Sequence, residues 1–331
     1  MAAAAEFPPP PPPSEGPPWA VELRDLRVDY GETLAVNDLT LQIRRGEVFG
    51  LVGPNGAGKT STFKVLATLL EPTYGEVRIG GLDLAEEPSA VRSRLGYMPD
   101  LAPVPSDLRV WEFLDFFGAA HGLSSQERAE RSEESLQAVR LTEKRQAKCS
   151  DLSRGMKQRL VLAKVMLHRP ELLILDEPAS GMDPLSRLAL RESLQAWAKE
   201  GRAVVVSSHI LGELSEMCTR IGVLHQGALL AEGPVDEVAN RLAGQGRKIR
   251  VRFLPGPRAG ERMASLVQED PAVTGLELEE GEAIFFYAGQ AEEQVALLRR
   301  LVEGGLQVES FAEERARLEE ALVSLDGGEQ E

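Results

Sequence analysis

The chain is poor in the residues that build disulfide frameworks, metal clusters and membrane spans. It has 331 residues but only two cysteines, Cys149 and Cys218, and four scattered histidines. These are too few and too far apart to indicate a disulfide framework or a metal cluster. The longest strongly apolar runs, such as LLIL at 172–175, have the length of a strand. Since a membrane span needs roughly 18–20 apolar residues, any membrane-spanning part must belong to another chain.

Positive charge is also scarce. The sequence has 37 lysines and arginines against 52 aspartates and glutamates, a formal net charge of −15. Binding to a phosphate backbone depends on cationic contacts, so this balance argues against a nucleic-acid partner. The N-terminus lacks the basic segment followed by an apolar segment that marks a signal peptide. These absences predict a cytoplasmic protein.

The composition and length of the chain indicate a folded protein with more than one domain. Hydrophobic residues make up 43% and charged residues 27% of the chain, and this length suits one large and one smaller domain. Residues 1–18 are rich in alanine and proline. Consecutive prolines favour extended polyproline II, so we expect a disordered tail, either a spacer or a ligand for an SH3-like partner. We place the main domain at 19–240 and an accessory domain at 247–331.

The main domain has the pattern of an α/β sheet. VELRDLRVDY (21–30) and LTLQIRRGE (39–47) alternate as half-buried antiparallel strands do. VFGLV, LLIL and AVVV are short, fully apolar runs, typical of parallel strands buried on both faces. Amphipathic helices are predicted over 106–150 and 153–168. The sequence therefore predicts an α/β core with an antiparallel β subdomain and a helical subdomain at about 101–168.

The accessory domain follows a polar linker, GQGRK. Strands are predicted at KIRVRF, TGLELEE, AIFFYAG and LQVESF, with helices around Met263, at EEQVALLRRLVEGG and at RARLEEALVSL (315–325). In order along the chain, the first six of these elements are β-α-β-β-α-β. This order predicts a small α+β module of ferredoxin-like type.

One glycine-rich segment matches a phosphate-binding loop. GPNGAGKT at 53–60 fits G-x-x-x-x-G-K-[ST], with a predicted strand before it and a helix after it. Its backbone N–H groups would face phosphate oxygens at a helix N-terminus. Lys59 would reach the β- and γ-phosphates and Thr60 would offer a hydroxyl to Mg²⁺; the alternative is a plain glycine-rich turn. The candidate nucleotide-binding residues are Gly53, Pro54, Asn55, Gly56, Ala57, Gly58, Lys59, Thr60 and Ser61.

Two acids end the apolar run of LLILDEP. Asp176 and Glu177 would lie at the carboxyl end of a buried strand, where open α/β sheets bind ligands. Asp176 could hold Mg²⁺ or its waters, and Glu177 could accept a proton from an attacking water. By themselves these two acids could equally form a solvated turn. The phosphate-binding loop in the same chain favours the catalytic interpretation.

A serine and a glycine begin another predicted helix at LSRGMKQR (152–159). Ser153 and Gly155 would form a second helix N-terminus able to bind an anion. Taken alone, the string could mean only that Ser153 caps the helix.

The order of these motifs resembles the nucleotide-binding subunit of ABC transporters. The phosphate loop is followed by LSRGM, LLILDEP, SGMDP (180–184) and His209 after VVVSS, and the resemblance covers about residues 20–238. It implies a P-loop NTPase core that binds and hydrolyses ATP with Mg²⁺. It also implies a head-to-tail dimer, in which Ser153 and Gly155 serve the ATP of the second subunit and Asp183 communicates across the interface.

The resemblance implies roles for two further residues. His209 matches the histidine that contacts the γ-phosphate, although an isolated histidine is more often structural. Tyr30 matches the aromatic residue that stacks on adenine, with a buried strand tyrosine as the alternative.

The LSRGM segment departs from LSGGQ, its commonest form in the resembled family, and this departure points to one group within the family. Arg154, Met156 and the following KQR resemble the ATPases of drug, ion and polysaccharide exporters, whose C-terminal extension the accessory domain also resembles. This implies separate membrane-spanning permease subunits, a homo- or heterodimer, and a place on the inner face of the cell membrane. The alternatives are a soluble ABC-type regulatory ATPase and a pseudo-ATPase that binds nucleotide without turnover.

Asp100 ends the stretch LGYMPD at 95–100. Most members of the resembled family have glutamine at this position, where it contacts Mg²⁺ and the attacking water. A carboxylate is a good ligand for a hard cation, but aspartate is one methylene shorter than glutamine. We expect Asp100 to contact Mg²⁺ through water; the alternative is a solvent-facing turn residue.

Overall fold

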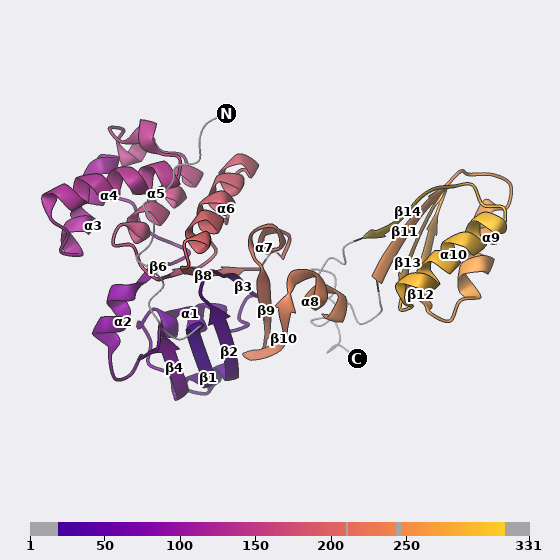
Figure 1. Cartoon of the computed structure of the whole chain (residues 1–331), viewed down its shortest axis with the longest axis horizontal. Helices are drawn as coiled ribbons and strands as arrows, with labels where there is room; N and C mark the ends of the chain where they lie inside the picture. The colour runs from indigo at the N-terminus through magenta and orange to yellow at the C-terminus, as the bar shows by residue number, and fades with distance from the viewer. Residues whose placement is uncertain (1–18, 210, 243–246, 315–331) are drawn as a thin grey trace. The chain divides into compact units, whose positions relative to one another are not determined.

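The computed structural model describes residues 19–209, 211–242 and 247–314 (Figure 1). The chain divides into two compact units, Met1–Gly233 and Pro234–Glu331. The predicted tail at 1–18 and the predicted helix at 315–325 lie outside the described residues. The domain boundaries at 240 and 247 stay predictions.

The first unit is built on a six-stranded sheet. Its strands, in spatial order, are β10 (Ala228–Pro234), β9 (Arg220–His225), β3 (Val48–Val52), β8 (Ala203–Ser208), β7 (Leu172–Leu175) and β6 (Leu95–Met98). The five strands from β9 to β6 run parallel. Every residue of β3, β7 and β8 is buried, which confirms that the continuous apolar runs are strands covered on both faces.

A second sheet of the first unit is antiparallel, as predicted. It has the order β2 (Thr33–Arg44), β1 (Trp19–Tyr30), β4 (Tyr74–Ile79) and β5 (Leu82–Asp83). Leu23 and Leu39 of this sheet share one buried cluster with Phe49 of β3 and Phe63. The two sheets therefore enclose a common core around the segment that joins β3 to the first helix.

The helices of the first unit differ from the prediction at their ends. They are α1 (Lys59–Leu66), α2 (Pro88–Arg94), α3 (Val110–Ala120), α4 (Ser125–Ala138), α5 (Arg154–Met166), α6 (Pro184–Lys199) and α7 (Leu211–Met217). The helix predicted after the phosphate loop, STFKVLATLL at 61–70, ends early at Leu66, because Thr68 takes a left-handed backbone with φ of 59°. Residues 139–153 contain two short 3₁₀ turns, Thr142–Lys144 and Cys149–Asp151, instead of the amphipathic helix predicted there. No described helix is both long and apolar enough to cross a membrane.

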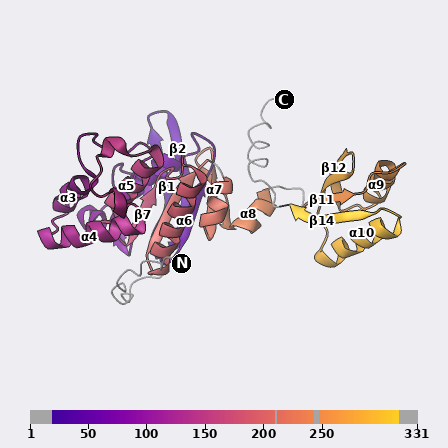
Figure 2. The same cartoon turned by 90° about the horizontal axis from the view of Figure 1, so that it is seen from above.

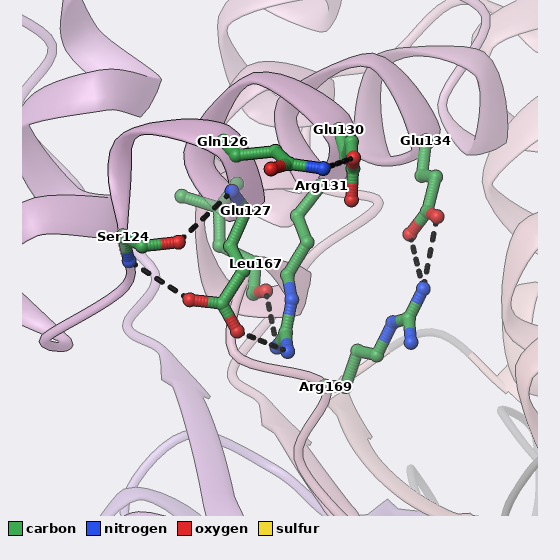
Figure 3. A network of polar contacts seen from close by, with 8 residues as sticks. All are labelled: Ser124, Gln126, Glu127, Glu130, Arg131, Glu134, Leu167 and Arg169. Carbon is green, nitrogen blue, oxygen red and sulfur yellow. Dashed lines mark hydrogen bonds and ion pairs between the residues drawn. The ribbon is translucent and has the colours of Figure 1, made fainter.

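The helical subdomain is tied to the core at the turn before β7 (Figure 3). The guanidinium of Arg169, just after α5, makes two bonds of 2.9 and 2.6 Å to the carboxylate of Glu134 on α4. Arg131 pairs with Glu127 at 3.5 Å and donates to the Leu167 carbonyl at 3.5 Å. A two-pronged arginine–carboxylate contact fixes orientation as well as distance. It therefore links α4 to the strand that carries Asp176 at its other end.

The second unit confirms the predicted ferredoxin-like order. After α8 (Val235–Leu242) come β11 (Arg247–Phe253), α9 (Ala259–Gln268), β12 (Val273–Glu279), β13 (Glu282–Tyr287), α10 (Ala291–Glu303) and β14 (Val308–Glu314). The sheet order is β12-β13-β11-β14, and every neighbouring pair is antiparallel (Figure 1). Figure 2 shows the same unit turned by 90°, with α10 beside β14. Met263 and Val267 of α9 and Leu297 and Leu301 of α10 pack into one cluster with alternate strand residues.

Candidate functional site

The loop between β3 and α1 needs glycine at defined positions. A Cβ at Gly53 would lie 2.3 Å from the Leu224 carbonyl oxygen, and one at Gly58, where φ is 102°, would lie 2.4 Å from the Ala35 carbonyl oxygen. Gly56 also has a positive φ of 86° but faces open space. No side chain caps the start of α1 at Gly58. The first N–H groups of α1 are thus available to an anion outside the loop.

The side chain of Lys59 folds back and bonds the backbone of this loop. Its ammonium donates to the carbonyl oxygens of Gly53 at 2.6 Å and Pro54 at 3.0 Å, and the residue is only 6% exposed. Burial lowers the pKa of Lys59, while the carboxylates of Glu177 and Asp176 act against that shift. The amine therefore lies between the loop and the two acids after β7.

Asp176 joins three elements. Its carboxylate accepts a hydrogen bond of 3.1 Å from the Thr60 hydroxyl on α1 and one of 2.6 Å from the Ser207 hydroxyl on β8. The residue is 3% exposed, and its N–H donates to the Met98 carbonyl at the end of β6. A buried carboxylate needs such donors. The sequence prediction that Thr60 and Asp176 act at one place agrees with this contact.

Glu177 takes a strained conformation beside Asp176. Its φ is 48°, a left-handed value that is uncommon for residues other than glycine and recurs at functional sites. Its N–H donates to the Ser207 hydroxyl at 2.9 Å, and its Oε2 lies 3.0 Å from Nδ1 of His209. Burial raises the pKa of Glu177, with His209 and Lys59 opposing that rise. This combination suits a carboxylate that accepts a proton.

Ser207 is the residue that sequence reasoning missed. It is fully buried, donates to Asp176 and accepts from Glu177, so its hydroxyl fixes both acids. A signal was available, because the carboxyl ends of neighbouring parallel strands meet at one edge of a sheet. The serines that end VVVSS on β8 had to lie beside the acids that follow β7.

Asp100 lies near the same edge but on the surface. The residue is exposed, and the pKa of Tyr97 is raised to about 12 by burial, then by the negative charges of Asp176 and Asp100. Asp100 also lines a groove of about 640 Å³ with Leu101, Ala102, Pro103, Arg154, Lys157, Gln158 and Val161. Asp100 is thus accessible to solvent, and its negative charge acts on the Tyr97 side chain.

The donor set fits Mg²⁺ bound largely through water and phosphate. Within the described ranges no group of three or more histidine, cysteine or acidic side chains could hold a metal by itself. Mg²⁺ commonly takes one or two protein oxygens and completes its shell with water and substrate phosphates. The Thr60 hydroxyl and the Asp176 carboxylate, 3.1 Å apart, supply such a pair.

Tyr30 ends β1 with its side chain accessible. It pairs with Thr33 across the hairpin and is 46% exposed. The alternative of a buried strand tyrosine is therefore wrong. An exposed ring at this position can stack on a flat ligand.

Ser153, Gly155 and Asp183 form a separate group. The Ser153 hydroxyl accepts from the Met156 N–H at 3.3 Å and so caps α5. Asp183 caps α6, accepting 3.0 Å and 2.7 Å hydrogen bonds from the N–H and hydroxyl of Ser186, and these bonds lower the pKa of Asp183. A Cβ at Gly155 would lie 3.0 Å from the Ser186 hydroxyl. The structure therefore brings the LSRGM and SGMDP segments together.

These two groups of residues define an ATP-binding cassette of the P-loop class. Residues 36–180 match the family model described as "ABC transporter". The chain is 33% identical over 309 residues to the Nod factor export ATP-binding protein I of Cupriavidus pinatubonensis, which covers 93% of this chain and 91% of that protein. It is 32% identical over 300 residues to the daunorubicin resistance ATP-binding protein DrrA3 of Streptomyces coeruleorubidus, covering 90% and 93%. The chain belongs to the ABC transporter family.

Solved structures agree with this assignment. An ATP-binding subunit of an ABC transporter matches with a TM-score of 0.61 and 33% identity, over 68% of this chain and 93% of that one. A dimeric ATP-binding cassette in a post-hydrolysis state with ADP and Pi matches with a TM-score of 0.58 and 25% identity, over 65% and 98%. The expectation of an ATPase subunit of an export-type ABC transporter is confirmed.

Proposed function

We propose that this chain binds ATP with Mg²⁺ at the edge formed by α1, β7 and β8, and hydrolyses it within a head-to-tail dimer that drives export. The observation that carries the proposal is the continuous set of contacts from Thr60 through Asp176 and Ser207 to Glu177. These contacts support Asp176 as a metal ligand and the adjacent Glu177 as a proton acceptor beside the phosphate-binding loop.

Each residue has a role that follows from its place. Lys59 and the loop N–H groups bind the β- and γ-phosphates. Thr60 and Asp176 would hold Mg²⁺, which would neutralise charge on the phosphates. Glu177 accepts the proton of the attacking water. His209, 3.0 Å from that carboxylate, orients Glu177 and reaches the γ-phosphate. Asp100 would reach the metal through water, and Tyr30 would stack on adenine.

The second group of residues serves the ATP of the other subunit. Ser153 and Gly155 begin α5, whose N-terminus can bind phosphate. Asp183 bonds Ser186, which lies beside Gly155, so a change in the SGMDP loop of one subunit would alter the start of α5 that is offered to its partner. The solved dimeric cassette with ADP and Pi supports such an assembly.

Separate membrane-spanning permease subunits are the partners on the membrane side. The groove beside Asp100 is a suitable docking place, because Leu101 at its rim is 83% exposed. A partner segment seated there would contact the loop that leads from β6 to the site. We accordingly propose a position on the inner face of the cell membrane. The named relatives serve Nod factor export and daunorubicin resistance; the proposal names no transported substrate.

The assignment is tested by comparing Lys59→Ala with Lys64→Ala. Both lysines lie on α1, but Lys64 is exposed near its end. Lys59→Ala should weaken ATP binding at least about tenfold, since hydrogen bonds to charged groups contribute about 1.5–3 kcal/mol. Lys64→Ala should bind as the parent chain does. Equal affinity of the Lys59→Ala protein, measured by titration calorimetry, would remove the loop from the proposed site.

A further inference from the structure

Arg154, the first residue of α5, covers part of the SGMDP loop. Gly181 of this loop has a left-handed backbone with φ of 67°. A Cβ at Gly181 would lie 2.6 Å from Cζ, 2.8 Å from Nη1 and 2.9 Å from Nε of Arg154. The guanidinium therefore fills the space beside this glycine. Any other residue there would need both an unfavourable φ and a displaced arginine.

A second contact between α5 and the SGMDP loop lies at the next residue, Gly155. A Cβ at Gly155 would lie 3.0 Å from the Ser186 hydroxyl, and Ser186 donates its N–H and its hydroxyl to the carboxylate of Asp183. Gly181 precedes Asp183 in the chain and Ser186 follows it. The first turn of α5 therefore contacts this segment both before and after Asp183.

Arg154 also lines the groove of about 640 Å³ that contains Asp100. Of the described residues around this groove, Asp100 supplies the acid, and Arg154 and Lys157 supply the bases. The first turn of α5 has no acidic residue. Cations are unfavourable at a helix N-terminus, because the helix dipole is positive there. An anion facing this end offsets that repulsion, and Asp100 is the anion that the groove provides.

We propose that Arg154 is a positioning residue that connects the Asp100 groove to the SGMDP loop. The charge of Asp100 attracts the guanidinium, and the guanidinium in turn holds the backbone of Gly181 in place. Neutralising Asp100 loosens the arginine, and the loop then opens more readily. The consequence for the dimer rests on the proposed function: because Asp183 acts across the head-to-tail interface, a partner segment seated in the groove would alter dimer closure through Arg154.

Hydrogen–deuterium exchange of the full chain, without nucleotide, tests the contact between Arg154 and the loop. Two backbone N–H groups report on the loop: Ser180 donates to the Glu177 carbonyl and Met182 to the Ala179 carbonyl, both at 3.1 Å. Such groups exchange when the segment opens locally. Arg154→Ala should raise their exchange rates at least about threefold. Arg154→Lys keeps the charge but lacks the flat guanidinium, so its rates should be intermediate.

A double-mutant cycle in the same measurement tests the link to Asp100. Asp100→Asn alone should raise the exchange rates of the loop, because it removes the charge that attracts Arg154. The chain with both Asp100→Asn and Arg154→Ala should stay within about twofold of Arg154→Ala alone, since coupled residues are not additive. Loop rates in Arg154→Ala equal to those of the parent would overturn the proposal. So would a double variant whose rates equal the product of the two single effects.

Lys157→Ala is the matched control. Lys157 has the same charge and lines the same groove, about one turn further along α5. Its removal should leave the exchange rates of Ser180 and Met182 unchanged. A loop that responds equally to Lys157→Ala and Arg154→Ala would mean that net charge in the groove, and not the guanidinium over Gly181, holds the loop; this result would also overturn the proposal.

Sedimentation equilibrium with MgATP tests the consequence for the dimer in the Glu177→Gln chain, where blocked turnover should keep the dimer closed. Adding Arg154→Ala should raise the dimer dissociation constant at least about threefold, while ATP affinity stays within about twofold. A Glu177→Gln chain that binds ATP but stays monomeric would contradict the head-to-tail dimer, and the exchange rates would still decide the role of Arg154. A weaker dimer with unchanged loop exchange would mean that Arg154 acts on the nucleotide of the other subunit, and would overturn the positioning role.

Discussion

The carboxylate of Glu177 and the imidazole of His209 are 3.0 Å apart, although one residue follows β7 and the other follows β8. The contact is possible because β7 and β8 are parallel neighbours, so both residues emerge at the same edge of the sheet. Burial raises the pKa of Glu177, while the hydrogen bond and charge of His209 lower it. His209 therefore acts on the pKa of Glu177, the residue that we propose as the proton acceptor.

Replacing Glu177 by glutamine should separate ATP binding from turnover. Glutamine keeps the shape of the side chain but cannot accept the proton, and a positioned general base contributes about 10²–10⁴-fold to rate. We expect the ATPase rate of Glu177→Gln to fall by about that factor while ATP affinity stays within a few fold of the parent. Steady-state turnover and titration calorimetry measure the two quantities. Turnover at the parent rate would exclude Glu177 as the base.

Removing His209 should move the acid limb of the pH–rate profile. A base must be deprotonated, so activity falls as pH drops through the pKa of Glu177. Because His209 lowers that pKa, His209→Ala should let it rise and shift the acid limb to higher pH. The midpoint of the limb is the readout, since the rate itself will also fall. His121→Ala, at an exposed histidine of the helical subdomain, should leave the midpoint in place.

Ser207→Ala should weaken both the fold and the site. The change removes a donor from the buried carboxylate of Asp176 and an acceptor from the Glu177 N–H. Leaving a buried polar group unsatisfied costs about 1–3 kcal/mol, more for a charged one. We expect unfolding free energy to fall by about that amount in urea denaturation, and hydrolysis to require more Mg²⁺.

Ser193→Ala provides the comparison for that variant. Ser193 is also buried, but its hydroxyl donates to backbone carbonyls of Ala138 and Ala189, away from the two acids. It should lose stability without any change in Mg²⁺ requirement. If both serine variants show the same Mg²⁺ curve, Ser207 only supports the fold.

Sequence patterns predicted the elements well where one local rule decided them. Apolar runs such as VFGLV could only be covered strands, and the glycines of the phosphate loop are needed by the close approach of Gly53 and Gly58 to neighbouring carbonyls. Tertiary context decided the rest. Nothing local showed that Glu177 adopts a left-handed backbone, because the Ser207 hydroxyl that accepts its N–H comes from a strand 30 residues away. Residues 139–153 likewise turn in short 3₁₀ segments rather than as a helix.

Asp100 is the subject of the last prediction, because its side chain is exposed to solvent and its charge also acts on the neighbouring Tyr97. The residue is exposed, yet its charge is felt at Tyr97 together with that of Asp176. A carboxylate about 6 Å from a γ-phosphate would be repelled by roughly 2–3 kcal/mol per unit charge at an effective dielectric of about 20. Bound Mg²⁺, reached through water, would offset that repulsion.

Two substitutions separate the effects of charge and length at this position. Asp100→Asn should make the ATPase rate depend less steeply on Mg²⁺ concentration, because a charge-assisted contact to the metal becomes a neutral one. Asp100→Gln should retain substantial ATPase activity, since it relieves the repulsion and restores reach. Asp107→Asn, at an exposed acid nearby, is the matched control and should follow the parent curve. ATPase rate is measured against Mg²⁺ concentration, with and without the membrane subunits; superimposable curves for all four proteins would make Asp100 an ordinary solvated turn residue.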